Sequence, residues 1–167
     1  DKTALAIEIL KSRDFAGRFI EENELYIPLM AAKGWSRPDN KLIINHNVYD
    51  ESSQQWVRKV KAPYHEKPSV QEAFEQFNKL FSVNQEKTSG MVKLSVEHYS
   101  PYLVKDWIDK LVKAINSEMR QRELSEAERS IAYLNNQISQ TNIADIRTML
   151  FSLIEEQTKT LMLANVR

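Results

Sequence analysis

Residues 100–140 decide the fold of this chain, and their sequence is SPYLVKDWIDKLVKAINSEMRQRELSEAERSIAYLNNQISQ. Ser100 can cap a helix start with its hydroxyl group, and Pro101 suits the first helical position, where its missing N–H costs nothing. No glycine or proline follows Pro101 up to Arg167. Apolar residues recur at helical spacings of three and four, as Val104, Ile108, Leu111, Ile115 and Met119, and again as Ala127, Ile131, Leu134 and Ile138. The stretch therefore predicts one very long helix, roughly 60 Å at a rise of 1.5 Å per residue.

The middle of this predicted helix is polar nearly all round. Its polar belt consists of Arg120, Gln121, Arg122, Glu123, Ser125, Glu126, Glu128 and Arg129. Arginine, glutamine and glutamate are good helix formers, so the helix should continue through the belt. Pairs four residues apart, such as Arg122 with Glu126, stabilise a helix by only a few tenths of a kcal/mol. We expect the helix to protrude and to need a partner, either the helix that follows or another copy of the chain.

The apolar row beyond the polar belt is the first candidate functional surface. Because the row continues past the belt, it indicates a self-association surface, although a helical hairpin within one chain would also bury it. The predicted interface residues are Arg120, Arg122, Glu123, Glu126, Ala127, Arg129, Ile131, Leu134 and Ile138.

The composition is that of a folded domain. Of the 167 residues, 42% are apolar, which is enough to bury a core. The 23 basic and 23 acidic residues cancel, which argues against a nucleic-acid binder, because such proteins need a basic excess. The absence of cysteine excludes disulfides and thiolate metal sites. No apolar run reaches the roughly eighteen residues that a transmembrane helix needs.

The other elements follow from periodicity and from capping residues. Two short helices open the chain, over residues 3–11 and then behind Ser12 or Asp14, and a third helix over 25–33 should end at Gly34. Residues 41–44 and 55–60 look like strands. Ser69 and Glu72 form a capping box for an amphipathic helix. Residues 82–85 and 91–99 predict a β-hairpin. Thr141 and Asn142 mark either a turn before a last helix or a kink in one continuous helix.

The sequence thus predicts an α+β fold. A small α/β base over residues 1–99 would lead, through the β-hairpin, into a very long protruding helix over 100–140. Helices would cover one face of a small sheet in the base. If the chain turns after residue 140, a second helix over 141–167 packs antiparallel on the first and returns toward the base.

The sequence gives no positive sign of an enzyme. Its glycines, Gly17, Gly34 and Gly90, are isolated, so no phosphate-binding loop can be drawn. The histidines lack a second ligand at the helical spacing of zinc enzymes. Adjacent acids such as Glu155 and Glu156 point about 100° apart on a helix and cannot converge on one bond. We therefore expect no catalytic residue, metal or cofactor.

Residues 56–67 mix aromatic and basic side chains and form a second candidate surface. Trp56, Arg58, Lys59 and Lys61 could stack on sugars or hold an anionic polymer or headgroup. The alternative, which we favour, is a strand whose Trp56 and Val60 pack inward while the basic side chains face water.

Several segments resemble one family in order and spacing. They are ALAIEILKSRDFAGRFIEE (4–22), VKLSVEHYSPYLVKDWI (92–108), EAERSIAYLNNQI (126–138) and LIEEQTKTLMLANVR (153–167). Together they resemble the periplasmic region of the Wzz family, the chain-length determinants or polysaccharide co-polymerases of Gram-negative bacteria. No single segment is diagnostic, but the resemblance covers nearly the whole chain.

The resemblance implies a periplasmic domain of a bacterial inner-membrane protein, with a transmembrane helix on either side of this stretch. Family members form ring-like homo-oligomers with an α/β base and a long helix. They have no known enzymatic activity of their own. They set the modal length of O-antigen in lipopolysaccharide biosynthesis, or of a related surface polysaccharide, which a separate Wzy-type polymerase makes. The expected partners are further copies of the chain, the polymerase and the polysaccharide.

Two other kinds of protein are alternatives to a member of the Wzz family. Bacterial tyrosine kinases of capsule and exopolysaccharide export have the same type of periplasmic domain, followed by a cytoplasmic ATP-binding domain. A helical adaptor of a secretion system is a third possibility. The start of the chain and its end, EEQTKTLMLANVR, look more like the members without a kinase domain.

Overall fold

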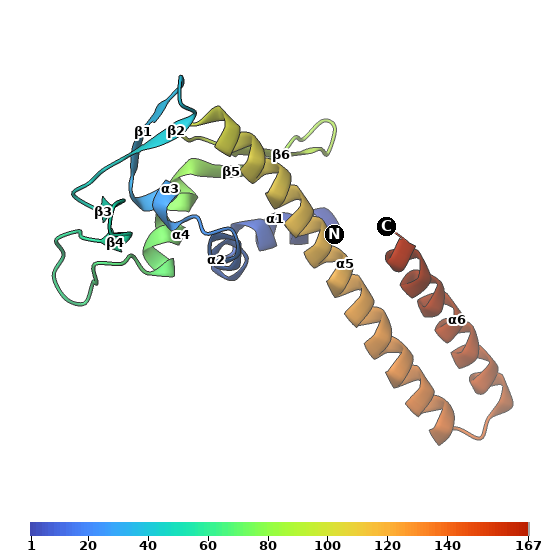
Figure 1. Ribbon diagram of the computed structural model, residues 1–167. Helices are drawn as coiled ribbons and strands as arrows, with labels where there is room; N and C mark the ends of the chain where they lie inside the picture. Colours follow the sequence, from blue (N-terminus) through green and yellow to red (C-terminus); the bar gives the residue numbers. More distant parts are fainter. Residues whose placement is uncertain (167) are drawn as a thin grey trace. The chain divides into compact units, whose positions relative to one another are not determined.

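The computed structural model describes residues 1–166, and the chain is α+β, as predicted. Its first part holds the elements α1 (Lys2–Lys11), α2 (Arg13–Glu22), α3 (Tyr26–Met30), β1 (Ala32–Ser36), β2 (Lys41–Ile44), β3 (Tyr49–Asp50), β4 (Gln55–Trp56), α4 (Val70–Leu80), β5 (Phe81–Gln85) and β6 (Val92–Val96). Two long helices follow, α5 (Pro101–Gln140) and α6 (Ala144–Val166) (Figure 1). The chain divides into two compact units, Asp1–Ile115 and Asn116–Arg167, which we describe separately.

The helix starts of the first unit follow their capping residues. Ser12 ends α1 and begins α2, because its hydroxyl donates to the Ile9 carbonyl at 2.7 Å and accepts from the Phe15 N–H at 3.2 Å. At α4 both bonds of the predicted capping box between Ser69 and Glu72 are present. The two opening helices and α4 are therefore confirmed.

The third predicted helix is wrong in its second half. Helix α3 ends at Met30, and Gly34 lies inside β1 rather than at a helix end. Strand β1 pairs with β2 antiparallel, and this pairing supplies the backbone hydrogen bonds that a longer helix would have made. A Cβ atom on Gly34 would lie 3.3 Å from the Ile43 Cδ1 atom, so the missing side chain lets the two strands pack closely.

The strands form three separate two-stranded antiparallel sheets in the described residues, β1 with β2, β3 with β4 and β5 with β6. The predicted hairpin before the long helix is confirmed as β5 and β6. The prediction of one small sheet with helices on one face is wrong, and so is the strand over 55–60, since β4 stops at Trp56.

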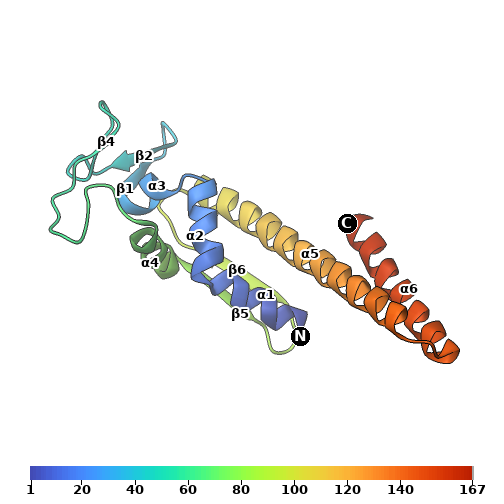
Figure 2. The same cartoon turned by 90° about the horizontal axis from the view of Figure 1, so that it is seen from below.

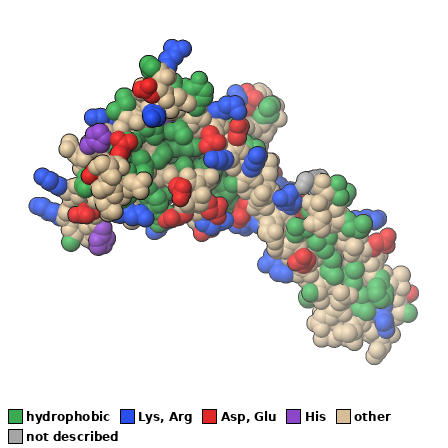
Figure 3. All heavy atoms as spheres, in the orientation of Figure 1, with side chains coloured by type: hydrophobic (Ala, Val, Ile, Leu, Met, Phe, Trp, Pro, Cys, Tyr) green, Lys and Arg blue, Asp and Glu red, His purple; other side chains and the backbone are tan. Residues whose placement is uncertain are grey.

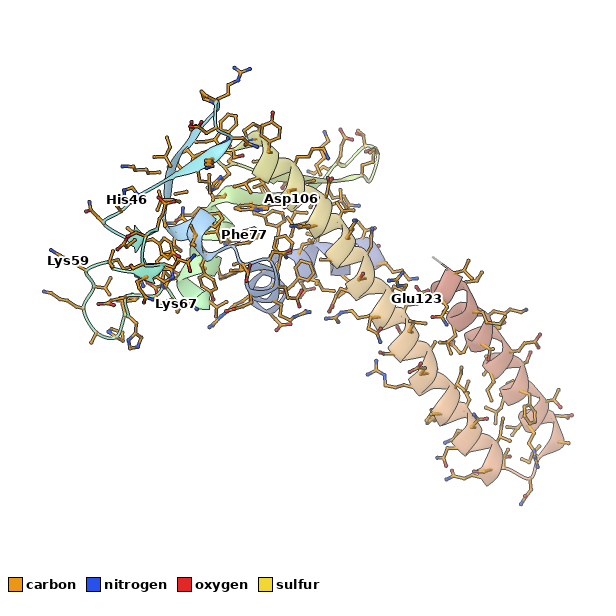
Figure 4. The ribbon with its side chains drawn as sticks, viewed as in Figure 1. His46, Lys59, Lys67, Phe77, Asp106 and Glu123 are labelled. Atoms are coloured by element: carbon orange, nitrogen blue, oxygen red, sulfur yellow. The ribbon has the colours of Figure 1, made fainter. Side chains whose placement is uncertain are left out.

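The core of the first unit gathers around Phe77 of α4, which is labelled in Figure 4. Its ring centroid lies 6.0 Å from that of Phe19, 5.3 Å from that of Phe81 and 6.5 Å from that of Trp107. These rings come from α2, β5 and α5, so α4 joins the opening helices to the hairpin and to the first turns of α5. Burial of such large rings is the main favourable term in the folding of this unit.

Helix α5 has the predicted bounds and contains 40 residues. It begins at Ser100, whose hydroxyl accepts from the Leu103 N–H at 3.2 Å. Residues up to Ile115 belong to the first unit, so this unit includes the first turns of α5. After α5 the chain turns at residues 141–143, which settles the choice between a turn and a kink.

Candidate functional site

The second unit is a helical hairpin in which α6 runs antiparallel beside the end of α5 (Figure 1 and Figure 2). The residues that it buries are Ala127 and Ile138 of α5, and Leu150 and Ala164 of α6. Small side chains such as alanine let two helices approach closely. The hairpin thus has a thin apolar seam of its own.

This seam uses part of the row that the sequence assigned to self-association. Ala127 and Ile138 are buried within the chain, while Ile131 and Leu134 are half-buried. Of the two partners considered for this row, the following helix covers Ala127 and Ile138. These two residues are thus not available to another copy in this conformation.

The charged residues of the predicted interface lie apart from the buried seam. Arg122 is largely exposed, and its Nε atom lies 3.2 Å from a carboxylate oxygen of Glu118 rather than pairing with Glu126 as expected. Arg120 is exposed, Glu123 is half-buried, and each has an interaction partner. Glu126 and Arg129 line a groove between the two helices of the hairpin. Their role between copies of the chain stays a prediction.

The groove has a volume of about 400 Å³ and is lined by side chains from both helices of the second unit. Leu134 and Tyr133 contribute from α5, and Leu153 contributes from α6. Tyr133 is 64% exposed although it is a large aromatic residue. An apolar floor with an acid and a base at its edge is typical of a surface that another helix covers.

Helix α6 continues this surface with an exposed apolar face. Ile146, Met149, Leu153 and Leu163 are all exposed, Met149 by 56% and Leu163 by 62%. They occupy positions of a heptad pattern with alternating spacings of three and four, in which the polar residues Glu156 and Thr160 stand at the two positions between Leu153 and Leu163. We call Ile146, Met149, Leu153 and Leu163 the α6 face. Green apolar side chains lie on the visible surface of this hairpin in Figure 3.

Sequence reasoning missed the α6 face because it considered a single stripe on this helix, Ile146, Leu150, Leu153 or Ile154, Leu161 and Ala164, and left Met149 and Leu163 out. In the structure Leu150 and Ala164 turn inward, whereas Met149 and Leu163, each one position earlier, stay exposed. Leu150 and Ala164 follow the same heptad pattern one position later, so spacing alone does not separate the two sets. A helix that is apolar on more than one side needs a partner on each.

In the second candidate surface, residues 56–67, Trp56 ends β4 and the residues after it form a loop rather than a strand. Trp56 packs edge-on against Tyr49, with ring centroids 5.0 Å apart. Val60, which we expected to pack inward, is exposed. Lys59 is exposed, as is Lys61, and both remain candidates for contact with an anion or a glycan. Lys59 is labelled in Figure 4 on this loop.

Arg58 has a different role from its neighbours, because it holds the loop to α4. Its Nε and Nη2 atoms donate to the carbonyls of Glu66 and His65, each at 2.8 Å. Its Nη1 and Nη2 atoms reach the two carboxylate oxygens of Glu72 at 2.8 and 2.9 Å. The side chain is only 14% exposed. The guanidinium group of Arg58 is therefore hydrogen-bonded within the chain, so Arg58 is not a candidate for contact with a ligand.

The same contacts set the charge of Glu72. The hydrogen bond from Arg58 is the main reason that the pKa of Glu72 is lowered to about 2, and the Ser69 backbone N–H adds to it. At the other end of the loop, the Lys67 ammonium lies 5.3 Å from the centre of the Tyr26 ring. Burial, followed by the hydrogen bond to Glu21, raises the pKa of Tyr26 to about 12.

The histidines do not come together. His46 lies 2.9 Å from Glu51 on the surface, and His98 contacts the Pro28 carbonyl. The part of the chain that the structure describes contains no cluster of three side chains suited to a metal ion. Among its helices, none is both long and apolar enough to cross a membrane.

Comparison with known proteins does not assign a function to these surfaces. No protein-family model matches the chain. Neither the curated proteins nor the solved structures contain a significant match to it.

Proposed function

We propose that this chain is an oligomeric, non-enzymatic regulator of surface polysaccharide length that acts with a Wzy-type polymerase. In this proposal it belongs to the periplasmic part of a bacterial inner-membrane protein. The resemblance of its four segments to the Wzz family motivates the proposal. The observation that supports it most is the α6 face, an exposed apolar surface beside a 40-residue helix.

A second copy of the hairpin is the partner that suits this surface. Heptad positions such as Met149 and Leu153 pack well against the same positions of another helix. Glu126 and Arg129 carry opposite charges in the adjoining groove, so two copies can place acid against base in both directions. Repeated copies would then present identical surfaces to a polymerase and to the growing polysaccharide.

The test is the length distribution of surface polysaccharide, run as a gel ladder. Cells that lack the gene should lose the preferred length, and the full-length gene should restore it. A gene carrying Met149→Glu with Leu153→Glu should fail to restore it, because two buried carboxylates would separate the copies. The matched control is Thr148→Glu with Ser152→Glu, which has the same charge and spacing on the same helix and should restore it.

The other outcomes separate the alternatives. An unchanged ladder in cells without the gene would remove the proposed function and favour an adaptor of a secretion system. Loss of the polymer altogether would instead point to a parent of the kinase type that acts in export.

A further inference from the structure

A cavity in the first unit has the features of a binding site that no prediction assigned. It has a volume of about 300 Å³ and lies among α3, β1, α4 and the residues that follow β6. Leu29, Ala32 and Leu80 supply its apolar wall, and Gln76, Glu97 and Tyr99 supply its polar groups. Ligand pockets run from roughly 300 to 1,000 Å³, so this one matches a single small ring.

His98 fixes one side of the cavity. Its Nε2 atom lies 2.8 Å from the Pro28 carbonyl oxygen, which can only accept, so this nitrogen carries a proton. Its ring packs between Trp107 and Tyr99, at centroid distances of 5.1 and 5.4 Å. The residues that follow β6 are thereby held to α3 and α5, and the cavity is largely formed in advance.

The same ring leaves a hydrogen-bond acceptor unused. The Nδ1 atom of His98 is buried and has no partner among the described residues. Buried polar atoms are normally paired, but this atom is enclosed by the protein, so we do not count it among the groups that contact a ligand.

The charge of the lining narrows the class of ligand. Glu97 supplies a carboxylate, and among the described residues no lysine or arginine lines the cavity. A phosphate or carboxylate ligand would be repelled, whereas hydroxyl groups can donate to Glu97 and to the Gln76 amide oxygen. The amide nitrogen of Gln76 can donate in return.

The aromatic residue at the edge of the cavity, Tyr99, narrows the class of ligand further. Tyr99 lines the cavity and is 55% exposed, so much of its side chain is available to a ligand. A pyranose has an apolar C–H face that packs on such a ring and hydroxyl groups around its edge. Its two kinds of surface match the apolar wall and the polar groups of the cavity.

We propose that this cavity binds one uncharged sugar residue, held by Gln76 and Glu97 and stacked on Tyr99. That the sugar belongs to the cell's own surface polysaccharide rests on the proposed function. The choice of an uncharged sugar rests on the cavity alone. The site belongs to the first unit, whereas the α6 face belongs to the second, and neither Lys59 nor Lys61 lines it.

The experiment is a two-dimensional NMR titration of the ¹⁵N-labelled chain. The probe is a mixture of short oligosaccharides released by mild acid from the surface polysaccharide of the producing cell. We expect saturable shifts of the backbone amides of Gln76, Glu97, His98 and Tyr99. Gln76→Ala with Glu97→Ala should weaken binding by about tenfold or more, since two hydrogen-bonding groups are lost.

The controls keep folding apart from binding. Gln121→Ala with Glu128→Ala makes the same two changes in the second unit and should leave the affinity unchanged. Tyr99→Phe should retain binding and Tyr99→Ala should lose it, because only the latter removes the stacking ring. Well-dispersed spectra of each variant establish that it is folded.

Three results would overturn the proposal. They are an absence of saturable shifts at the cavity, unaltered affinity in the Gln76 and Glu97 double variant, and tighter binding of inorganic phosphate than of oligosaccharide at these residues. The proposed function is judged separately by the gel ladder. A gene-dependent ladder without oligosaccharide binding removes only the sugar site, and binding with an unchanged ladder removes only the length regulator.

Discussion

Arg58 shows how one side chain can decide the shape of a long loop. Its guanidinium group contacts the carbonyls of His65 and Glu66 and both oxygens of Glu72, so it closes residues 57–68 against the start of α4. In the sequence Arg58 is one of several basic residues near aromatic ones, which suggests either a ligand contact or, as we favoured, a strand whose basic side chains face water. Only the fold brings Glu72, fourteen positions later, within reach of it.

Replacement Arg58→Lys should destabilise the chain although it keeps the positive charge. A lysine has one ammonium group and cannot make this forked set of bonds. We expect a loss of about 2 kcal/mol in the free energy of unfolding, measured by urea titration. Limited trypsin digestion should also cut faster after Lys59. The control Lys61→Ala changes an exposed residue of the same loop and should alter the free energy little, and equal losses in both variants would contradict the role given to Arg58.

The lowered pKa of Glu72 predicts how the stability of the chain responds to acid. In the folded chain Glu72 stays ionised down to about pH 2, whereas in the unfolded chain it takes up a proton near its ordinary value of 4.5. Its contribution is therefore fully present above about pH 4.5 and is lost as the pH falls toward about 2. Unfolding free energies of the wild type and of Glu72→Gln should differ most at neutral pH and converge in acid. A difference that stays constant with pH would rule out this linkage.

Among the elements, those with strong local signals were predictable. The capping box at Ser69 and Glu72, the alternating strand before Ser100 and the uninterrupted helical spacing after Pro101 each depend on near neighbours. The prediction that Gly34 ends a helix was wrong because its position in β1 depends on the pairing of β1 with β2, which is a tertiary effect. The apolar row predicted on α5 did not include Trp107. In the structure Trp107 and Leu111 are the most deeply buried residues that α5 contributes to the first unit.

The α6 face makes a prediction about α6 as an element. If Met149 and Leu153 pack on another copy, the sedimentation coefficient of the wild-type chain should rise with concentration. The variant Met149→Glu with Leu153→Glu should stay at the monomer value. Thr148→Glu with Ser152→Glu should behave as the wild type does. Identical behaviour of all three chains would remove α6 from any contact between copies.

For the whole molecule, the sequence predicted a base followed by long helices, and the first compact unit of the structure also includes the first turns of α5. The end of the first unit at Ile115 reflects the packing of Trp107 and Leu111 into the same core as Phe77. Helical periodicity looks alike on both sides of this boundary, so it carries no information about where a core ends. The sugar site was equally out of reach, because Gln76 and Glu97 come from separate elements and have no motif in common.

The pairing of β5 with β6 alone, among the described residues, has a consequence for how the chain behaves in solution. Each strand has one outer edge whose peptide groups are not paired with a further strand of this sheet. Such edges can pair with strands of neighbouring molecules. Lys93 in β6 and the polar residues Ser82 and Asn84 in β5 oppose this pairing. A charged or small polar side chain on an edge strand disfavours the addition of a strand from another molecule. The side chains of this hairpin therefore limit the pairing of its open edges with strands of other molecules, and replacing Lys93 by an apolar residue would make aggregation through β6 easier.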